Sequence, residues 1–344
     1  MQYRQLGSTD IKVSLICLGT MTFGEQNSEK EAHEQLNFAM DHGINFIDTA
    51  ELYAVPSNPK NNGLTEQYIG TWLKDRRDRD KIIVATKVTG PSANLKYIRP
   101  NLGFSVAAIH EAVEKSLRQL QTDYIDLYQL HWPERKANFF GKLDYKHDAK
   151  WEDNFVEVLR TLDGLVKSGK IRHYGISNET PWGAMRYLYL ADQLGVARPV
   201  SIQNPYSLIN RSFEVGLAEV AIRENCGLLA YSPLGFGMLT GKYHRKDARA
   251  DARLNKYKVM SRYMGERTHQ ATAEYLKVAE EHQLNMAQMA LAYVNTRPFV
   301  TSNIIGATNL SQLKENIESA QISLSDAVIK AIDKVHASNP NPAP

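Results

Sequence analysis

Short apolar runs alternate along this chain with longer stretches in which apolar residues recur every three or four positions. The short runs are typical of buried strands, and the longer spacing is typical of amphipathic helices. The runs predict strands at 15–20, 45–50, 82–88, 124–132, 172–178, 200–206, 227–233 and 303–308. Helical stretches lie between them, for example at 28–43, 105–121, 154–170 and 213–227. Alternation of this kind over eight units predicts an α/β fold, a single parallel (β/α)8 TIM barrel.

Capping residues and glycines mark the ends of several predicted helices. Ser28 followed by Glu31 has the spacing of a capping box, in which each residue bonds the backbone N–H of the other. Gly43, Gly169 and Gly195 stand where helices should stop, because glycine adopts the left-handed conformation that ends a helix.

Three segments fall outside the strand–helix units. Residues 3–14 contain two short runs around a Gly-Ser-Thr-Asp turn and predict a β-hairpin before the first barrel strand. Residues 243–264 are basic with weak periodicity and predict a long loop after the seventh strand. Residues 340–344 predict a loose tail. We expect one domain over 1–344.

Composition and charge narrow the class of protein. The chain is 43% hydrophobic and 23% charged, as in ordinary globular proteins. A net charge of +3, without a basic cluster interleaved with aromatics, argues against a nucleic-acid surface. Cys17 and Cys226 lie in apolar segments and predict buried thiols in a reducing compartment. No signal peptide and no membrane-length apolar run is found, so we expect a cytoplasmic protein without membrane association.

Polar residues end six consecutive predicted strands, at the edge where active sites of this fold lie. They are Asp48, Lys87, His131, Ser177, Asn178, Gln203, Asn204, Tyr231 and Ser232. One such residue often only begins a loop. Together they predict a pocket.

Four residues suit one chemical task, proton transfer to a carbonyl oxygen. A tyrosine hydroxyl is a weak acid, and a nearby ammonium should lower its pKa by stabilising tyrosinate. We therefore expect Tyr53 to act as general acid, Lys87 to lower its pKa, Asp48 to keep Lys87 charged, and a neutral His131 to orient the substrate. The plainer alternative is that Asp48 begins a turn and Tyr53 only packs.

The chain resembles the aldo-keto reductases over nearly its whole length. The resemblance rests on the ordered motifs IDTAELY, ATKV, LYQLHWP, GKIRHYGISN, IQNPYS, AYSPLGFGMLTGKY and IIGATNLSQLKENI. It places the family's catalytic Asp, Tyr, Lys and His on Asp48, Tyr53, Lys87 and His131. Within the family, FGEQNSE and NPYSLINRSFEVGLAEV resemble the bacterial Tas-type branch most.

The resemblance implies an oxidoreductase that reduces small aldehydes or ketones with NADPH, held without a Rossmann fold. In agreement, no strand is followed by G-x-G-x-x-G, and the glycine-rich turn near 237 is no P-loop because Phe236 and Tyr243 break that motif. The implied cofactor residues are Gly19, Thr20, Met21, Ser177, Asn178, Gln203, Tyr231, Ser232, Pro233, Leu234, Gly235, Gly237, Lys242, Arg253, Gly306, Thr308, Gln312, Glu315 and Asn316.

Each part of that set has an expected role. Tyr231 should stack on the nicotinamide, and Ser177, Asn178 and Gln203 should hold its carboxamide. The residues from Ser232 to Lys242 should line the pyrophosphate, and those from Gly306 to Asn316 should reach the adenosine. The plainer alternatives are that Gln203 caps a turn and that Glu315 and Asn316 lie on an exposed helix.

Departures from the family pattern concern selectivity. Gln312 stands where many relatives carry an arginine for the 2′-phosphate, so we expect Arg253 in the basic loop, or Lys256 or Lys258, to supply the charge that favours NADPH over NADH. The alternative is that these are solvated loop cations. The 54–65 segment is long and could cover the site. The expected apolar walls of the substrate pocket are Phe23, Trp132, Phe139 and Phe140.

Two other functions fit parts of the pattern. A cofactor-binding regulatory subunit, as in the potassium-channel β-subunits, would keep the same four residues. A metal-dependent barrel hydrolase would need converging His, Asp and Glu ligands, and Lys87 beside Asp48 and His131 would repel a cation, so we expect no metal. The sequence leaves the substrate and the oligomeric state open.

Overall fold

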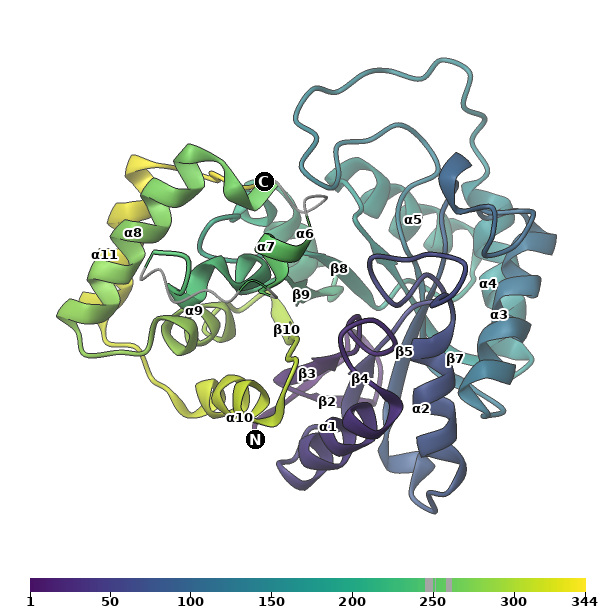
Figure 1. Ribbon diagram of the computed structural model, residues 1–344. Coiled ribbons are helices and arrows are strands. Elements are labelled where there is room, and N and C mark those ends of the chain that lie inside the picture. The colour runs from purple at the N-terminus through teal and green to yellow at the C-terminus, as the bar shows by residue number, and fades with distance from the viewer. Residues whose placement is uncertain (245–249, 251, 258–261) are drawn as a thin grey trace.

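Eight parallel strands close into a barrel, in the order β10-β3-β4-β5-β6-β7-β8-β9 (Figure 1). The structure is a computed structural model that describes residues 1–244, 250, 252–257 and 262–344. The barrel strands are β3 (Ile16–Gly19), β4 (Phe46–Asp48), β5 (Ile83–Val88), β6 (Ile125–Leu130), β7 (Ile171–Ser177), β8 (Ser201–Pro205), β9 (Gly227–Tyr231) and β10 (Val300–Ile305). The predicted TIM barrel is confirmed, and every predicted strand overlaps one of these.

Helices surround the barrel. They are α1 (Glu29–Asp41), α2 (Leu64–Lys74), α3 (Val106–Leu120), α4 (Phe155–Lys167), α5 (Pro181–Leu194), α6 (Leu217–Arg223), α7 (Arg253–Lys256), α8 (Glu266–Glu281), α9 (Met286–Asn295), α10 (Leu310–Glu318) and α11 (Asp326–Ser338). Short 3-10 helices are η1 (Arg79–Lys81), η2 (Ala93–Leu95), η3 (Ser212–Val215), η4 (Gly235–Thr240) and η6 (Ser319–Gln321). Helices α8 and α11 lie side by side at one flank of the barrel (Figure 1).

The predicted helix ends have the expected geometry. Ser28 and Glu31 form a complete capping box at the start of α1. Gly43, Gly169 and Gly195 follow or cap α1, α4 and α5 with positive φ angles of 81°, 76° and 62°. These are conformations in which a side chain would be strained.

Two predicted elements have different bounds from those expected. The predicted helix at 213–227 is divided into η3 and α6, because Gly216 between them has a non-helical φ of −158°. The eighth strand begins at Val300, before the predicted run, and ends at Ile305, so that Gly306 already belongs to the following loop. The β-branched residues Val300 and Thr301 extend the strand backwards.

The predicted hairpin of β1 (Tyr3–Gln5) and β2 (Lys12–Ser14) closes one end of the barrel. Leu6 and Val13 are fully buried in a cluster with inward-facing strand residues such as Cys17, Phe46 and Ile83. Those strand residues lie at or near the amino ends of their strands. The hairpin therefore blocks the amino end of the barrel and leaves the carboxyl end for a site.

The prediction of a loose tail is wrong. Ala343 is 1% exposed and its backbone N–H donates to the carbonyl of Ile209 at 3.1 Å. The side chain of Asn341 accepts a bond from the backbone of Arg211 at 2.6 Å, and Thr268 donates to the carbonyl of Pro342 at 3.1 Å. These bonds satisfy backbone groups that a free tail would leave to water.

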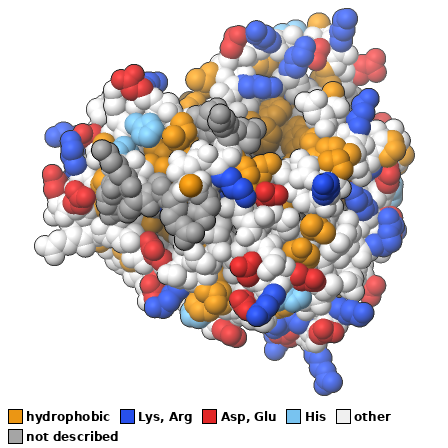
Figure 2. Space-filling model, viewed as in Figure 1, with side chains coloured by type: hydrophobic (Ala, Val, Ile, Leu, Met, Phe, Trp, Pro, Cys, Tyr) orange, Lys and Arg blue, Asp and Glu red, His pale blue; other side chains and the backbone are white. Residues whose placement is uncertain are grey.

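Surface charge is mixed. Side chains of both signs are interspersed over the face seen in Figure 2. Within the described residues, no helix combines the length and apolar character that crossing a bilayer requires.

The carboxyl group of Glu66 is buried in the layer between the barrel and the helices. Glu66 on α2 has no exposed surface, and its Oε1 accepts a bond from the hydroxyl of Thr86 on β5 at 2.6 Å. Its Oε2 has no hydrogen-bond partner among the described residues. Burial raises the pKa of Glu66 to about 7, and the Glu51 carboxylate adds to the rise. Ionised Glu66 therefore destabilises the fold.

We predict that Glu66→Gln raises the free energy of unfolding, and does so more at pH 8 than at pH 5. The pKa of Glu66 is raised in the folded state, so stability is greatest below the unfolded pKa near 4.5 and falls as pH rises to about 7. A shift of this size corresponds to a loss of roughly 3 kcal/mol at pH 8, as an upper bound. Urea unfolding of both proteins at the two pH values measures it, and an equal difference at both pH values would contradict it.

Candidate active site

A cavity of about 1460 Å³ opens at the carboxyl ends of the strands. Asp48, Tyr53 and His131 of the predicted catalytic set line it. The predicted cofactor residues that line it are Gly19, Thr20, Met21, Ser177, Asn178, Gln203, Tyr231, Ser232, Pro233, Leu234, Gly237, Lys242, Arg253, Gly306, Thr308, Gln312, Glu315 and Asn316. Residues far apart in the sequence thus line one cavity, as the strand-end pattern predicts.

Lys87 lies behind the part of the cavity wall that contains Asp48 and Tyr53, and it contacts both residues. Its side chain has no exposed surface, and Nζ donates to Asp48 Oδ2 and to the carbonyl of Thr49, both at 2.7 Å. The hydroxyl of Tyr53 lies 3.4 Å from the same nitrogen. The ring of His131 lies 6.0 Å from that of Tyr53, centroid to centroid. The four predicted catalytic residues are therefore neighbours.

Two glutamines hold the second oxygen of Asp48. Asp48 Oδ1 accepts bonds from Gln203 Nε2 at 2.8 Å and from Gln129 Nε2 at 3.2 Å. Gln203 also donates to Gln129 Oε1 at 3.1 Å. Gln203 therefore serves the carboxylate as well as lining the cavity. The sequence analysis missed Gln129, although strand alternation places it on the same side of β6 as His131.

Burial and charge set the protonation of the cluster. Burial raises the pKa of Tyr53, and the nearby Lys87 ammonium offsets only part of the rise. The effect of Lys87 on this pKa has the predicted sign, but the loss of solvation outweighs it, so the net shift is upward. Burial acts to lower the pKa of Lys87, but the Asp48 carboxylate overcomes it and the net shift is upward. Burial and Lys87 hold the pKa of His131 well below its usual value. At neutral pH Tyr53 is thus a phenol, Lys87 an ammonium and His131 a neutral imidazole.

A second chain of hydrogen bonds runs along the wall from β7 to β9. Tyr231 donates from its hydroxyl to Asn178 Oδ1 at 2.6 Å, and Asn178 Nδ2 donates to the carbonyl of His131 at 2.8 Å. Ser177 donates to the carbonyl of Gln203 at 2.7 Å. The amide of Asn178 is therefore engaged on both sides, which fixes the tyrosine ring at the cavity.

The glycine-rich turn after β9 forms η4, with an irregular backbone. Gly235, Phe236 and Gly237 have positive φ angles of 52°, 54° and 96°. A Cβ atom on Gly237 would lie 3.2 Å from Lys242 Nζ, so glycine leaves room for this ammonium beside the turn. Gly235 does not line the cavity. It is buried where a Cβ atom would lie 2.6 Å from Ile209.

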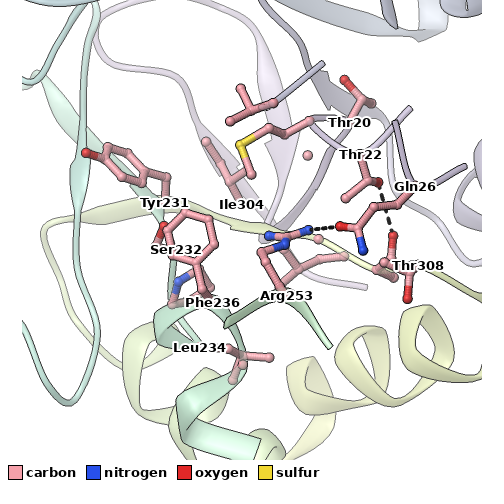
Figure 3. A pocket seen from close by; sticks show the side chains of 18 of the residues that line it. Thr20, Thr22, Gln26, Tyr231, Ser232, Leu234, Phe236, Arg253, Ile304 and Thr308 are labelled. Atoms are coloured by element: carbon pink, nitrogen blue, oxygen red, sulfur yellow. Dashed lines mark hydrogen bonds between the residues drawn. The ribbon is translucent and has the colours of Figure 1, made fainter. Parts of the chain in front are cut away.

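Arg253 on α7 reaches across the cavity from the loop after strand β9. Its Nη2 lies 3.4 Å from Gln26 Oε1, and its guanidinium lies 5.3 Å from the centre of the Phe236 ring (Figure 3). Gln312 accepts bonds from the backbone and hydroxyl of Thr308 at 3.0 and 3.1 Å. Lys258, one of the two lysines named as alternatives to Arg253, lies outside the described residues.

Glu25 joins the loop after β9 to the opposite side of the cavity. It accepts a bond from the hydroxyl of Tyr257 at 2.8 Å and another from Asn61 at 3.0 Å, and Lys256 lies 3.7 Å away. The long 54–65 segment, which contains Asn61, is thereby fastened near the cavity mouth. Sequence reasoning missed Glu25 and Gln26, because only the fold brings them to α7.

The four residues predicted to form the apolar walls lie in different environments. Phe140 lines the cavity and packs against Trp132, with ring centres 6.0 Å apart. Phe139 packs on Phe140 at 5.1 Å, and neither Phe139 nor Trp132 is among the residues that line the cavity. Phe23 has no exposed surface and belongs to the main hydrophobic core, so its assignment to the pocket wall is wrong.

Among the residues that the structure describes, no group of three or more His, Cys, Asp or Glu side chains is placed to hold a metal ion.

Comparison with known proteins agrees with this geometry. Residues 15–337 match the model of the aldo/keto reductase family. The chain is 52% identical to Protein tas of Escherichia coli K12 over 100% of both chains. The chain belongs to the aldo/keto reductase family.

Other members of the aldo/keto reductase family are also similar to it. The chain is 32% identical to the uncharacterized oxidoreductase YrpG of Bacillus subtilis, over 97% of this chain and 96% of the relative. It is 30% identical to a probable voltage-gated potassium channel subunit beta of Arabidopsis thaliana, over 99% and 98%. The chain is thus an oxidoreductase of a family that uses nicotinamide cofactors, and the full-length similarity to Tas agrees with the predicted branch.

We predict that Lys87→Met destabilises the protein, because Asp48 would remain buried without its cation. Breaking a buried pair costs roughly 3–5 kcal/mol, and we expect the lower end because Gln129 and Gln203 still bond Asp48. Chemical unfolding measures the loss. The double variant Asp48→Asn with Lys87→Met should recover part of it, and no recovery would show that the loss comes from packing instead of charge.

Proposed function

We propose that this protein reduces aldehydes or ketones to alcohols with NADPH, and that Tyr53 is the general acid. The observation that carries the proposal is the Tyr53 hydroxyl at a cavity wall, 3.4 Å from a buried Lys87 ammonium that Asp48 holds at 2.7 Å. A phenol next to a fixed cation can release its proton to a reacting oxygen, because the cation stabilises the tyrosinate that remains.

The cavity fits a nicotinamide dinucleotide. Its length runs from the Tyr53 wall to Thr308 and Arg253, and its volume of about 1460 Å³ leaves room for a dinucleotide together with a small substrate. Gly306 has no atom within 4 Å of where a Cβ would stand, so the backbone there is open to a ligand. Tyr231 would hold the nicotinamide, η4 and Lys242 the phosphates, and Thr308 with Asn316 the adenosine.

When bound, the nicotinamide supplies the hydride that reduces the carbonyl carbon. Tyr53 delivers the proton to the carbonyl oxygen. Lys87 stabilises the developing tyrosinate, and Asp48 holds Lys87 charged and in place. The neutral imidazole of His131 lines the cavity beside Tyr53 and orients the substrate oxygen. The raised pKa of Tyr53 keeps the phenol protonated before reaction.

Preference for NADPH over NADH would rest on Arg253. A 2′-phosphate brings negative charge and several acceptor oxygens, which favour a guanidinium. Arg253 lines the same cavity as Gln312 and Thr308 and makes no ion pair with an Asp or Glu of the described residues. Gln312 and Thr308 offer only neutral groups, so the arginine is the cation best able to meet the phosphate.

A second candidate function is a cofactor-binding regulatory subunit with weak reductase activity. The similarity to the Arabidopsis channel subunit beta supports it. Fluorescence titration with NADPH and NADH, without divalent metal, tests cofactor binding for both functions. Steady-state reduction of a panel of aldehydes then separates them, because a regulatory subunit would oxidise bound NADPH in a single slow turnover.

We predict that Tyr53→Phe abolishes steady-state carbonyl reduction and leaves NADPH affinity nearly unchanged. The hydroxyl supplies a proton in the transition state and contributes little to holding the cofactor. Rates come from NADPH absorbance and affinity from fluorescence titration. Turnover within a few-fold of wild type would eliminate Tyr53 as the acid.

We predict that Arg253→Ala weakens NADPH binding about tenfold or more and barely changes NADH binding, since a hydrogen bond to a charged group is worth roughly 1.5–3 kcal/mol. The matched control is Lys256→Ala, which removes a neighbouring cation that lies 3.7 Å from Glu25. Dissociation constants for both cofactors measure the effect. Equal losses for NADPH and NADH, or a selective loss only in the Lys256 variant, would refute the assignment.

A further inference from the structure

Arg262 is a cavity-lining arginine that the site described above does not use. Its Nη2 donates to the hydroxyl of Tyr263 at 2.9 Å. Its Nη1 is buried and makes no hydrogen bond of normal geometry with the described residues, while the hydroxyl of Tyr231 lies beside the guanidinium. No Asp or Glu in the described part of the chain forms an ion pair with Arg262. A guanidinium nitrogen buried without a partner is costly, and an arginine fork suits a carboxylate.

Arg262 lies next to the loop that carries the aromatic wall. A Cβ atom on Gly141 would lie 3.3 Å from Arg262 Cδ, and the preceding Phe140 lines the cavity. Phe140 packs against Trp132 at 6.0 Å between ring centres. Arg262 therefore lines the cavity beside the loop that places Phe140 in the lining, with Trp132 behind that ring.

Two series of side-chain contacts connect Arg262 with His131 and Tyr53 at the reacting end of the cavity. The ring of Trp132 lies 4.8 Å from that of His131, which is 6.0 Å from the ring of Tyr53. On the other side, Arg262 lies beside the hydroxyl of Tyr231, whose partner Asn178 bonds the carbonyl of His131. At least two residues separate Arg262 from His131 along each route, Phe140 and Trp132 on one and Tyr231 and Asn178 on the other.

No Asp or Glu side chain of the described residues is paired with Arg262, and the backbone oxygen of Pro344 lies 3.3 Å from the same Gly141 Cβ position that Arg262 Cδ approaches. Asp48 is held by Lys87 at 2.7 Å, and Glu25 is held by Tyr257 and Asn61 near α7. The side chains that act on Arg262 itself are those of Tyr263 and Tyr231.

We propose that Arg262 binds a carboxylate on the substrate, so that the enzyme selects aldehydes and ketones that join a carboxylate to an apolar body. The apolar body would lie against Phe140, with the carbonyl at Tyr53 and the carboxylate at the guanidinium. The inference rests on the proposed reductase function and specifies its substrate class.

Matched aldehyde pairs test this selectivity. The probes are 3- and 4-carboxybenzaldehyde and their methyl esters, which differ in charge but share the ring and the aldehyde. For at least one pair, wild-type enzyme should show a kcat/KM for the acid about tenfold above that for the ester, the value expected for a hydrogen bond to a charged group. Arg262→Met should reduce this ratio to near one, leave the ester rate close to wild type, and leave NADPH affinity unchanged.

Two further variants separate recognition from structure. Arg262→Lys keeps the charge but loses the fork, so the ratio should be intermediate, and it serves if the Met variant does not fold. Arg223→Met removes an arginine of α6 whose side chain is 76% exposed, and should change nothing.

Three results would overturn the inference. The first is an acid-to-ester ratio unaltered by the Arg262 variants, including an equal loss for both probes, which would mean that Arg262 only positions Tyr231. The second is weaker NADPH binding with that ratio unchanged, which would assign Arg262 to the cofactor. The third is a wild-type protein that reduces neither probe nor any neutral aldehyde, which would overturn the proposed function as well.

Discussion

A lysine ammonium without exposed surface has to be neutralised where it lies, and this constraint shapes the centre of the barrel. Lys87 on β5 is met by the carboxylate of Asp48 on β4 and by the carbonyl of Thr49. The second oxygen of Asp48 then needs donors of its own, which come from Gln129 on β6 and Gln203 on β8. One buried charge thus ties together four strands, and Tyr53 lies within reach of the same nitrogen.

The cavity combines this rigid wall with a mouth built from loops. The wall consists of side chains at or near the ends of strands, bonded to one another within the barrel. The mouth is formed by the glycine-rich turn of η4, by α7 and by the segment after Tyr53. Glu25 connects Tyr257, which follows α7, with Asn61 of that segment. Polar groups at the wall are fixed before any ligand arrives, and this kind of preorganisation favours charge that develops during a reaction. Groups at the mouth come from segments distant in sequence, where side chains differ more readily between relatives.

Much of the fold and the tetrad could be predicted from the sequence, because both depend on local patterns. Apolar runs gave the eight strands, and their last residues gave Asp48, Lys87 and His131. Features set by tertiary packing were missed or wrong. The burial of Phe23 in the core and the packed tail around Ala343 depend on neighbours distant in sequence. The pKa of Tyr53 depends on the balance between solvation and charge, which residue types alone cannot give.

The barrel seam lies between the first and the last of its strands. Asn303 on β10 pairs with Ile16 on β3, and nearby Ser302 donates to the carbonyl of Ser14, 288 residues earlier. Pairing between such distant residues requires the closure of a long loop, which slows folding. Gln203 and Asp48, 155 residues apart, bond inside the same ring of strands. A nascent chain therefore cannot hold the Lys87 cluster in place until most of the ring has been synthesised, so a partly made protein lacks the machinery for proton transfer.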